Sequence, residues 1–459
     1  MRYISTRGAA PALTFRDAML AGLASDGGLY VPESVPQLST REIAGLAGLS
    51  YQELALRIMT PFVGDDFSQG ELKRMIDAAY GSFRHAAIAP LTQLSHNHFL
   101  LELFHGPTLA FKDFALQLLG QLMETALKDS AQQSLVLGAT SGDTGSAAIA
   151  GLRGRKGIDI AILFPDGRTS EVQRRQMTTV ADANVHAIAI DGTFDDCQDM
   201  VKALFSDAGL RSRVNLLAVN SINFARVLAQ VVYYFYAALA LGAPARRVSF
   251  TVPTGNFGDI YAGYIARQMG LPTAKLVIAS NRNDILARCV ATGTYQMNGV
   301  HASLSPSMDI EISSNFERLL FDLYGRDGAQ LAQRMAEFRS AKSLTLPVAA
   351  HADLRSVFTA HSADDATTLA TIKKTYAQSE YLLDPHTAVG VHAAKQSGVE
   401  GIMVTLATAH PAKFPDAVRE ATGVSPVLPP HMADLFSRPE RSMKMAADAE
   451  ALKQWILQR

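Results

Sequence analysis

From about residue 98 onward, short runs of valine, isoleucine and leucine alternate with segments of helical length. Near-continuous apolar runs are typical of strands that are buried on both faces, and the helical spacers provide the crossovers that parallel strands require. The pattern therefore predicts an α/β fold built from parallel-sheet domains. The expected strands are 99–104, 134–137, 159–164, 186–190, 248–252, 276–279 and 401–406.

The chain has 459 residues, more than one compact core usually holds, so two or three domains are expected. Residues 1–92 lack the alternation and predict an N-terminal extension domain, in which Ser50 and Glu53 fit a helix capping box. Residues 93–459 would form the core. Within the core we predict a small subdomain at about 128–240, a helical insertion at about 315–380 and a C-terminal tail at about 428–459.

Composition argues against several classes of protein. With 42 basic and 43 acidic residues the net charge is −1, which gives no electrostatic footprint for nucleic acid or an anionic membrane. Cys197 and Cys289 are the only cysteines, so neither a disulfide framework nor a thiolate metal site is indicated. The N-terminus lacks the apolar core of a secretory signal, and the longest apolar run, 227–241, is too short to span a bilayer. We therefore expect a cytoplasmic protein without a metal site.

Lys112 stands between Phe111 and Phe114, at the start of a helix that is expected to run to about Leu127. Lysine is almost never fully buried, so by residue type alone a snorkelling surface amine is the better interpretation. The alternative is a desolvated lysine, whose lowered pKa makes it a nucleophilic amine that can form a Schiff base with a carbonyl cofactor. Which interpretation holds depends on the chemistry of the other loops.

Three loops follow an expected strand and open a helix, which is where open α/β sheets bind ligands. The first, 138–145, carries Ser141, Asp143 and Thr144 between glycines, and its place at a helix N-terminus would suit a carboxylate or a phosphate. Two alternatives remain open. One is a dinucleotide loop with Asp166 as the ribose-binding acid, although the glycine spacing is not GxGxxG. The other is a glycine turn needed only for backbone geometry.

The second loop, 253–259, contains Gly255 and Gly258, which allow consecutive backbone amides to converge on a phosphate. It lacks the Gly-Lys-Ser/Thr of a nucleotide-triphosphate loop, so no γ-phosphate or magnesium chemistry is implied. The third loop, 406–414, places Thr408 and His410 after an apolar strand. A helix cap for Thr408 and a structural hydrogen bond for His410 are the simpler roles at those positions.

A fourth segment, 220–226, ends with Arg226 at the start of a strongly apolar helix, where a solvated charge has little reason to be. A guanidinium there is suited to bidentate capture of a phosphate or carboxylate, with Ser221 as a helper. The alternative is an ordinary buried salt bridge.

Five motifs in a fixed order make the chain similar to the threonine synthase family, most of all to its longer branch from bacteria and fungi. They are Pro-Thr-x-x-Phe-Lys-Asp, Thr-Ser-Gly-Asp-Thr-Gly, Asn-Ser-Ile-Asn-x-x-Arg, Pro-Thr-Gly-Asn-Phe-Gly-Asp and Thr-Ala-His-Pro-Ala-Lys-Phe. The resemblance covers essentially the whole chain. It implies a fold type II enzyme, similar to tryptophan synthase β, that binds pyridoxal 5′-phosphate and acts as a monomer or homodimer. The implied reaction converts O-phospho-L-homoserine and water to L-threonine and phosphate.

The resemblance also implies roles for single residues. Lys112 would form the Schiff base and act as general acid and base. The cofactor phosphate would be held by Gly255, Asn256, Phe257 and Gly258, the pyridine nitrogen by Thr408, the substrate by Ser141, Asp143 and Thr144, and the leaving phosphate by Ser221 and Arg226. One departure concerns the cofactor's 3′ oxygen, which related enzymes often contact with an asparagine where this loop has Asp143. Either Asn223 makes that contact, or Asp143 is turned away.

Other functions share part of this evidence. A phospho-lyase of the same family would eliminate phosphate from O-phosphohomoserine to give 2-oxobutyrate, by the same early steps. A nicotinamide-dependent oxidoreductase built on the 138–145 loop is the alternative from another class of enzyme. A catalytically inactive binding protein is the third, and every expected motif position of this chain is filled.

Overall fold

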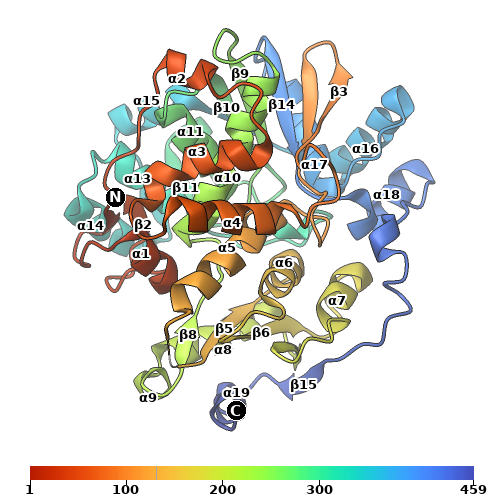
Figure 1. Cartoon of the computed structure of the whole chain (residues 1–459). Coiled ribbons are helices and arrows are strands. Elements are labelled where there is room, and N and C mark those ends of the chain that lie inside the picture. Colours follow the sequence, from red (N-terminus) through yellow and green to blue (C-terminus); the bar gives the residue numbers. More distant parts are fainter. Residues whose placement is uncertain (131) are drawn as a thin grey trace.

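The computed structural model describes residues 1–130 and 132–459, and it contains a large and a small sheet, in the upper and lower parts of Figure 1. The large sheet has six strands in the order β13-β10-β9-β14-β4-β3, with every neighbouring pair parallel except β3 and β4. Its strands are β3 (Leu91–Ser95), β4 (His98–Glu102), β9 (Val248–Pro253), β10 (Thr273–Ser280), β13 (Phe358–Ser362) and β14 (Ile402–Ala407).

The small sheet has five strands in the order β15-β7-β6-β5-β8, and all its neighbouring pairs are parallel. Its strands are β5 (Ser134–Ala139), β6 (Ile158–Pro165), β7 (Val185–Asp191), β8 (Asn215–Leu217) and β15 (Met443–Ala446). The predicted α/β fold with parallel sheets is therefore confirmed. In these two sheets, the strands that the apolar runs do not predict are the four edge strands, β3, β8, β13 and β15, which have a neighbouring strand on one side only.

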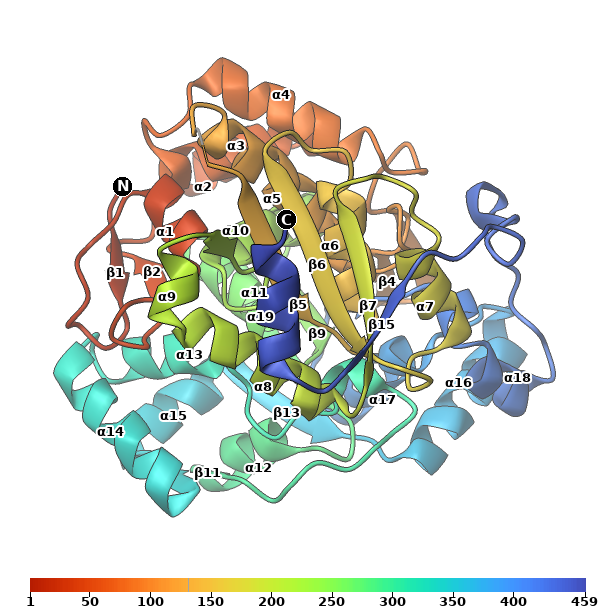
Figure 2. The ribbon, with the colours of Figure 1, turned by 90° about the horizontal axis from the view of Figure 1, so that it is seen from below.

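Helices cover both faces of the small sheet because its central strands are apolar on both faces. Leu135, Leu137 and Leu163 pack against α8 (Phe194–Ser206) and α19 (Ala449–Leu457) in one cluster. Val136 and Ile160, whose side chains point the other way, belong to the main core with α6 (Asp143–Leu152). Figure 2 shows β5, β6, β7 and β15 side by side, with α19 crossing the sheet. The remaining helices of this part are α7 (Glu171–Thr178) and α9 (Ala208–Arg211).

The large sheet is covered in the same way. Val277 and Ala279 pack against α17 (Pro385–Gln396) on one face. Phe250 and Ile278 pack on the other face in the main core, which includes α10 (Phe224–Ala240) and α11 (Gly258–Gln268). The central helix α5 (Lys112–Leu127) joins α6 of the small-sheet part to α10 of the large-sheet part, and its residues 112–120 are all buried. Lys112 therefore begins a helix that has little access to water.

The N-terminal residues form helices that pack onto this centre. They comprise β1 (Tyr3–Ser5), α1 (Phe15–Ala21), β2 (Tyr30–Pro32), α2 (Thr40–Ala44), α3 (Tyr51–Val63) and α4 (Gln69–Tyr80). The predicted capping box at Ser50 and Glu53 is present at the start of α3. Tyr51 of α3 and Tyr80 of α4 both contact Phe114 of α5, so this unit helps to bury the start of the central helix.

Residues 315–380 contain the expected helices, and they also contain β13, which pairs in parallel with β10 at the edge of the large sheet. The helices are α13 (Phe316–Leu323), α14 (Gly328–Ala341), α15 (Val348–Val357) and α16 (Asp365–Ser379). Before them lie α12 (Ile285–Thr292) and β11 (Thr294–Gln296), which pairs with β12 (Ser343–Thr345), and the short turn η1 (Pro306–Met308). After β14 come η2 (Pro411–Lys413), α18 (Pro415–Thr422) and η3 (Pro430–Met432).

The C-terminal tail runs from α18 along the outside of the molecule to the small sheet (Figure 1). It contacts α7, where Glu440 accepts a hydrogen bond of 2.6 Å from the Thr178 hydroxyl and pairs with Arg174. None of the helices in the described residues is both long and apolar enough to cross a membrane.

Asp259 connects α11 to α10 and gives a testable dependence of stability on pH. Its Oδ1 accepts hydrogen bonds from the hydroxyls of Tyr233 (2.6 Å) and Tyr234 (2.9 Å), yet burial raises its pKa to about 7. The folded state therefore holds a proton that the unfolded chain releases near pH 4, so stability falls as pH rises from about 4 to about 7. We expect Asp259→Asn to stabilise the protein at pH 8, by up to about 4 kcal/mol, and to change little at pH 4.

Thermal unfolding at pH 4, 6 and 8 measures this effect. Asp416→Asn, at a carboxylate that is 89% exposed, serves as the control that should show no such trend. An equal effect of Asp259→Asn at all three values would contradict the ionisation of Asp259 as its cause.

Candidate active site

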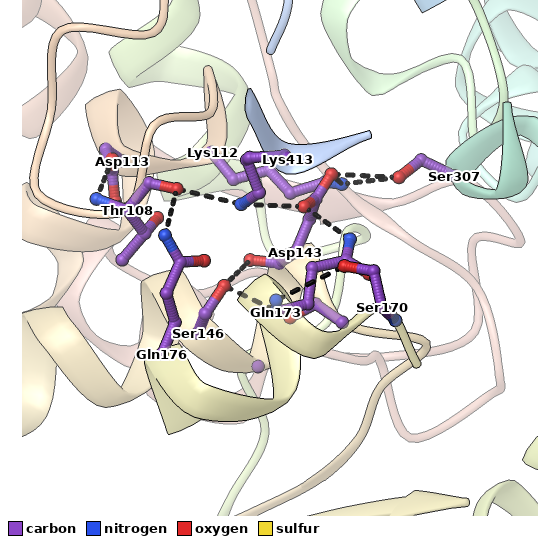
Figure 3. A network of polar contacts seen from close by, with 12 residues as sticks. Thr108, Lys112, Asp113, Asp143, Ser146, Ser170, Gln173, Gln176, Ser307 and Lys413 are labelled. Carbon is purple, nitrogen blue, oxygen red and sulfur yellow. Dashed lines mark hydrogen bonds and ion pairs between the residues drawn. The ribbon is translucent and has the colours of Figure 1, made fainter. Parts of the chain in front are cut away.

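Lys112 lies in a buried polar network that joins both sheet-containing parts of the molecule (Figure 3). Its Nζ is 3.0 Å from Asp143 Oδ2, at the start of α6, and 3.1 Å from the Ser307 hydroxyl, in η1. The Ser307 hydroxyl in turn donates to Asp143 Oδ2 at 3.0 Å. Only 9% of the Lys112 surface is exposed. The interpretation of Lys112 as a desolvated amine is the one that the structure supports.

The turn before α5 fixes the position of Lys112. The Asp113 carboxylate accepts hydrogen bonds of 2.7 Å from both the backbone amide and the hydroxyl of Thr108, which closes the turn. A Cβ at Gly106 would come within 2.5 Å of that carboxylate, so the position requires glycine. The Phe111 amide also donates to the Thr408 carbonyl at 2.9 Å. The start of α5 is thereby tied to the carboxyl end of β14.

Asp143 is the centre of the network. Its Oδ1 is 2.8 Å from the Nζ of Lys413 and accepts a hydrogen bond of 2.8 Å from the Gln173 amide, while its Oδ2 faces Lys112. Burial alone would raise the pKa of this carboxyl, but the charges of Lys112 and Lys413 outweigh that effect and hold the pKa well below its usual value. Asp143 is therefore a carboxylate shared between two lysines.

The pKa of the Lys112 amine is also lowered, but for an amine this shift favours the neutral form. Burial lowers its pKa, Asp143 opposes part of that lowering, and the charges of Lys413 and Arg226 add to it. A larger fraction of Lys112 is therefore a neutral, nucleophilic amine near neutral pH than for an exposed lysine.

The loop after β9 forms a backbone cradle. Phe257 adopts a left-handed conformation with φ 64°, directly before α11. The carbonyl groups of the loop face residues 313–315. The Gly255 carbonyl accepts a hydrogen bond from the Ser313 hydroxyl, and the Asn256 carbonyl accepts one of 3.0 Å from the backbone amide of Asn315. Within residues 1–130 and 132–459, no protein group accepts a hydrogen bond from the amides of residues 255–258. These amides are available to an anion at a helix N-terminus.

Arg226 is buried, and no carboxylate of the described residues provides a counter-charge. One of its nitrogens donates to the Val219 carbonyl at 2.9 Å, its Nε has no hydrogen-bond partner, and none of the described carboxylates forms an ion pair with it. Desolvation lowers the pKa of its guanidinium to about 10. A buried salt bridge is therefore not the reason for this residue, and an unpaired guanidinium is a site for an anionic ligand. Ser221 lies five residues before it, where its carbonyl accepts from Asn315 at 3.2 Å.

Other predicted residues take the following places. Ser141 and Thr144 are partly exposed in the loop between β5 and α6, where the Thr140 hydroxyl fixes the loop by accepting from the Gly142 and Gly145 amides, each at 2.9 Å.

Thr408 is buried, and its hydroxyl has no hydrogen bond to a described residue. His410 caps η2 by accepting from the Ala412 amide at 3.1 Å, and burial lowers the pKa of its imidazole to about 4. His410 is thus a structural hydrogen-bonder.

The expected contact of Asn223 with a cofactor is not supported. Its amide oxygen accepts from the Ala225 amide at 3.1 Å as the cap of α10, and its amide nitrogen donates to the Met19 carbonyl at 2.8 Å. The side chain is fully buried. The alternative, an Asp143 turned away from the 3′ oxygen, stays a prediction; the Asp143 carboxylate points toward Lys112, with Oδ2 3.0 Å from its Nζ.

The structure adds three residues that the sequence does not single out: Lys413, Ser307 and Gln173. Lys413 is fully buried, and its Nζ also donates to the Thr108 carbonyl at 2.8 Å. A weak signal for Lys413 is its place inside the fifth motif, Thr-Ala-His-Pro-Ala-Lys-Phe, whereas Ser307 lies in Ser-Pro-Ser-Met-Asp, residues 305–309, outside the five motifs. Gln173 lies outside those motifs, so nothing in the sequence points to it.

Residues 2–80 match the family model "Threonine synthase N terminus", residues 86–338 match "Pyridoxal-phosphate dependent enzyme" and residues 387–456 match "Threonine synthase, C-terminal". The threonine synthase of Pseudomonas aeruginosa is 54% identical over 100% of this chain and 98% of its own length. The chain belongs to the threonine synthase family. It is thus a member of the pyridoxal-phosphate-dependent enzymes, and the predicted family and fold type II class are confirmed.

Solved structures of the family agree in detail. A pyridoxal-phosphate-bound threonine synthase from Brucella melitensis is 51% identical and superposes with a TM-score of 0.97, covering 99% of this chain and 98% of that one. The yeast threonine synthase is 42% identical, with a TM-score of 0.94 and the same coverage.

The residues of the site fit pyridoxal phosphate, the cofactor named by the matched family model. Lys112 supplies a buried amine, and the loop at 255–258 supplies free amides for a phosphate. The cradle has no room for a side chain at position 255, since a Cβ there would come within 2.8 Å of the Ser307 carbonyl.

Proposed function

We propose that this protein is a threonine synthase, converting O-phospho-L-homoserine and water to L-threonine and phosphate with pyridoxal 5′-phosphate bound through Lys112. The observation that carries the proposal is Arg226, a buried guanidinium with no carboxylate partner among the described residues, in the same site as a desolvated lysine. A substrate that carries its own phosphate supplies the charge that this arginine lacks.

When bound, the cofactor supplies an electron-withdrawing ring that stabilises negative charge on the substrate carbon next to it. The protein supplies the groups that bind the cofactor and substrate and that transfer protons. Lys112 Nζ would hold the cofactor, and as a buried amine of lowered pKa it would take and return protons. The amides of residues 255–258 would hold the cofactor phosphate, and the uncommitted hydroxyl of Thr408 would face the pyridine nitrogen.

Two anion sites would hold the substrate. Ser141 and Thr144, at the N-terminus of α6, suit its α-carboxylate, because unpaired amides and the helix dipole favour a negative charge there. Arg226 and Ser221 suit the phosphate, and the guanidinium would stabilise the charge that grows as this group leaves. Asp143 has no free charge for substrate, since Lys112 and Lys413 neutralise it.

Incubating the purified enzyme with O-phospho-L-homoserine tests the proposal. Inorganic phosphate and L-threonine should appear in equal amounts, measured by a phosphate assay and by amino-acid chromatography. Phosphate accompanied by 2-oxobutyrate instead of threonine would show a phospho-lyase. Phosphate release that is absent at saturating substrate and cofactor would reject both.

We propose further that the enzyme is cytoplasmic and that it is a monomer or a homodimer. It rests on the sequence and on the resemblance, and light scattering of the purified protein measures the oligomeric state.

Gly255→Ala tests the phosphate cradle. The added methyl group would meet the backbone of Ser307 and Met308, at 2.8 and 3.3 Å, and backbone cannot rotate aside. We expect cofactor affinity to fall by about tenfold or more, since 1.4 kcal/mol corresponds to a factor of 10 in affinity. Titration of the visible absorption with pyridoxal phosphate measures it. Gly70→Ala, where a Cβ meets nothing within 4 Å, is the matched control, and equal affinities in both variants would contradict the cradle.

A further inference from the structure

Lys413 has no role in the reaction described above, yet it is the most deeply buried lysine of the site. Its side chain is 0% exposed, against 11% for Lys112. It makes two polar contacts, each of 2.8 Å, one to Asp143 Oδ1 and one to the Thr108 carbonyl. Burying an ammonium group costs free energy unless the group is paired. The presence of Lys413 at this buried position therefore suggests that its ion pair with Asp143 has a function.

The two lysines contact different oxygens of the same carboxylate. Lys112 contacts Oδ2 at 3.0 Å, and Lys413 contacts Oδ1 at 2.8 Å (Figure 3). Lys112 is the group whose charge changes, because a lysine that carries a cofactor or transfers protons does not stay an ammonium. Without Lys413, the loss of that charge would leave Asp143 as a buried carboxylate without a cation.

We propose that Lys413 is a positioning residue that keeps Asp143 ionised and aimed at Lys112 while the charge of Lys112 changes. The inference rests on the proposed role of Lys112 as the cofactor-bearing lysine. Lys413 reaches Asp143 from η2, Gln173 holds the same oxygen from α7 at 2.8 Å, and Ser307 bridges to Lys112 from η1. Three elements thus fix the carboxylate independently of Lys112.

The other charges around the pair are consistent with this arrangement. Arg226 is a further cation that lowers the pKa of Lys112, and Lys413 itself lowers it by repulsion. His386 Nε2 accepts a hydrogen bond of 3.2 Å from the Ser307 amide, and its Nδ1 lies 2.9 Å from Asp384 Oδ1. A positive charge on this ring would also favour the ionised form of Asp143. Asp113 accepts from Thr108, and the charge of Lys413 opposes the rise of its pKa, which burial brings to about 6. Because the charges of Asp143 and Lys413 offset each other at 2.8 Å, Lys112 and Arg226 remain as the positive charges available to anionic ligands.

Removing the charge of Lys413 should therefore change the titration of Lys112. Asp143 would pair with Lys112 alone and the repulsion would vanish, so the pKa of Lys112 should rise by about one unit or more. The full-length protein, freed of cofactor, is treated with acetic anhydride at a series of pH values, and acetylation of Lys112 is followed by mass spectrometry. In the holoenzyme, the acid limb of the kcat profile should move to higher pH by a similar amount.

Three variants separate charge from packing. Lys413→Met removes the charge and the hydrogen bond to Thr108, Lys413→Gln retains a donor without the charge, and Lys413→Arg retains the charge. The Met and Gln variants should shift the titration of Lys112 equally, and the Arg variant should leave it near that of the natural protein. Lys275→Met is the control, because among the described residues Lys275 donates to the backbone carbonyls of Arg355 and Ser356 alone, at 2.8 and 3.0 Å.

A folded Met or Gln variant whose Lys112 titrates as in the natural protein would overturn the proposal, whatever its activity. Lower activity without a shift in Lys112 would likewise overturn it, because it would show a purely structural role. A shifted titration in a protein that makes no threonine would support the role of Lys413 and reject the proposed function instead.

Discussion

Replacing Lys112 with alanine is expected to lower the rate of phosphate release by about 10³-fold or more, the largest effect we predict, because one amine both holds the cofactor and moves protons. The fold should survive, since Asp143 keeps its contacts with Lys413 and Gln173. A phosphate-release assay at saturating O-phospho-L-homoserine measures the rate. Borohydride treatment followed by mass spectrometry should find cofactor on Lys112 in the natural protein and none in the variant.

Lys128→Ala is the matched control for this experiment. Lys128 caps the other end of the same helix, its side chain is 55% exposed, and it forms a surface pair with Glu71 at 3.4 Å. Its loss should leave activity and cofactor attachment unchanged. Full activity in Lys112→Ala, or borohydride labelling of another lysine, would contradict the assignment.

The second large effect is expected for Arg226→Met. Loss of the guanidinium should lower kcat/KM for O-phospho-L-homoserine by about 10²- to 10³-fold, as for other groups that stabilise developing charge. Inorganic phosphate should also become a weaker inhibitor, while cofactor absorption remains. Stability should change little, because losing the single hydrogen bond to the Val219 carbonyl is offset by removing a buried cation that has no partner carboxylate among the described residues.

Arg318→Met is the contrasting variant. Arg318 is also fully buried, but its guanidinium donates to the Tyr30 carbonyl at 2.9 Å and to the Asn315 side chain, which tie the N-terminal strand to the 315 segment. Its loss should lower the unfolding temperature, because these acceptors would be left unpaired. If Arg226→Met lowers stability as Arg318→Met does and leaves turnover unchanged, Arg226 is a structural residue and the proposed phosphate site is wrong.

Much of the architecture is predictable from the sequence because central parallel strands are apolar on both faces. Strands β5, β6, β7, β9 and β14 coincide with the apolar runs. Edge strands do not produce that signal: β13 contains Thr359, His361 and Ser362, and its position beside β10 depends on a partner about 80 residues away. The capping box at Ser50 and Glu53 is local, and it is found as predicted.

The sequence by itself determined the family, the parallel α/β fold and the residues of the motifs, including Lys112, the glycine cradle and Arg226. The tertiary structure alone decided how their charges are balanced. It placed Asp143 between Lys112 and Lys413, left Arg226 without a carboxylate among the described residues, and used Asn223 as a helix cap. The reason is physical: the state of a buried charge depends on neighbours that are distant in the chain. Lys112 and Lys413, 301 positions apart in the numbering, meet at one carboxylate only when the chain is folded.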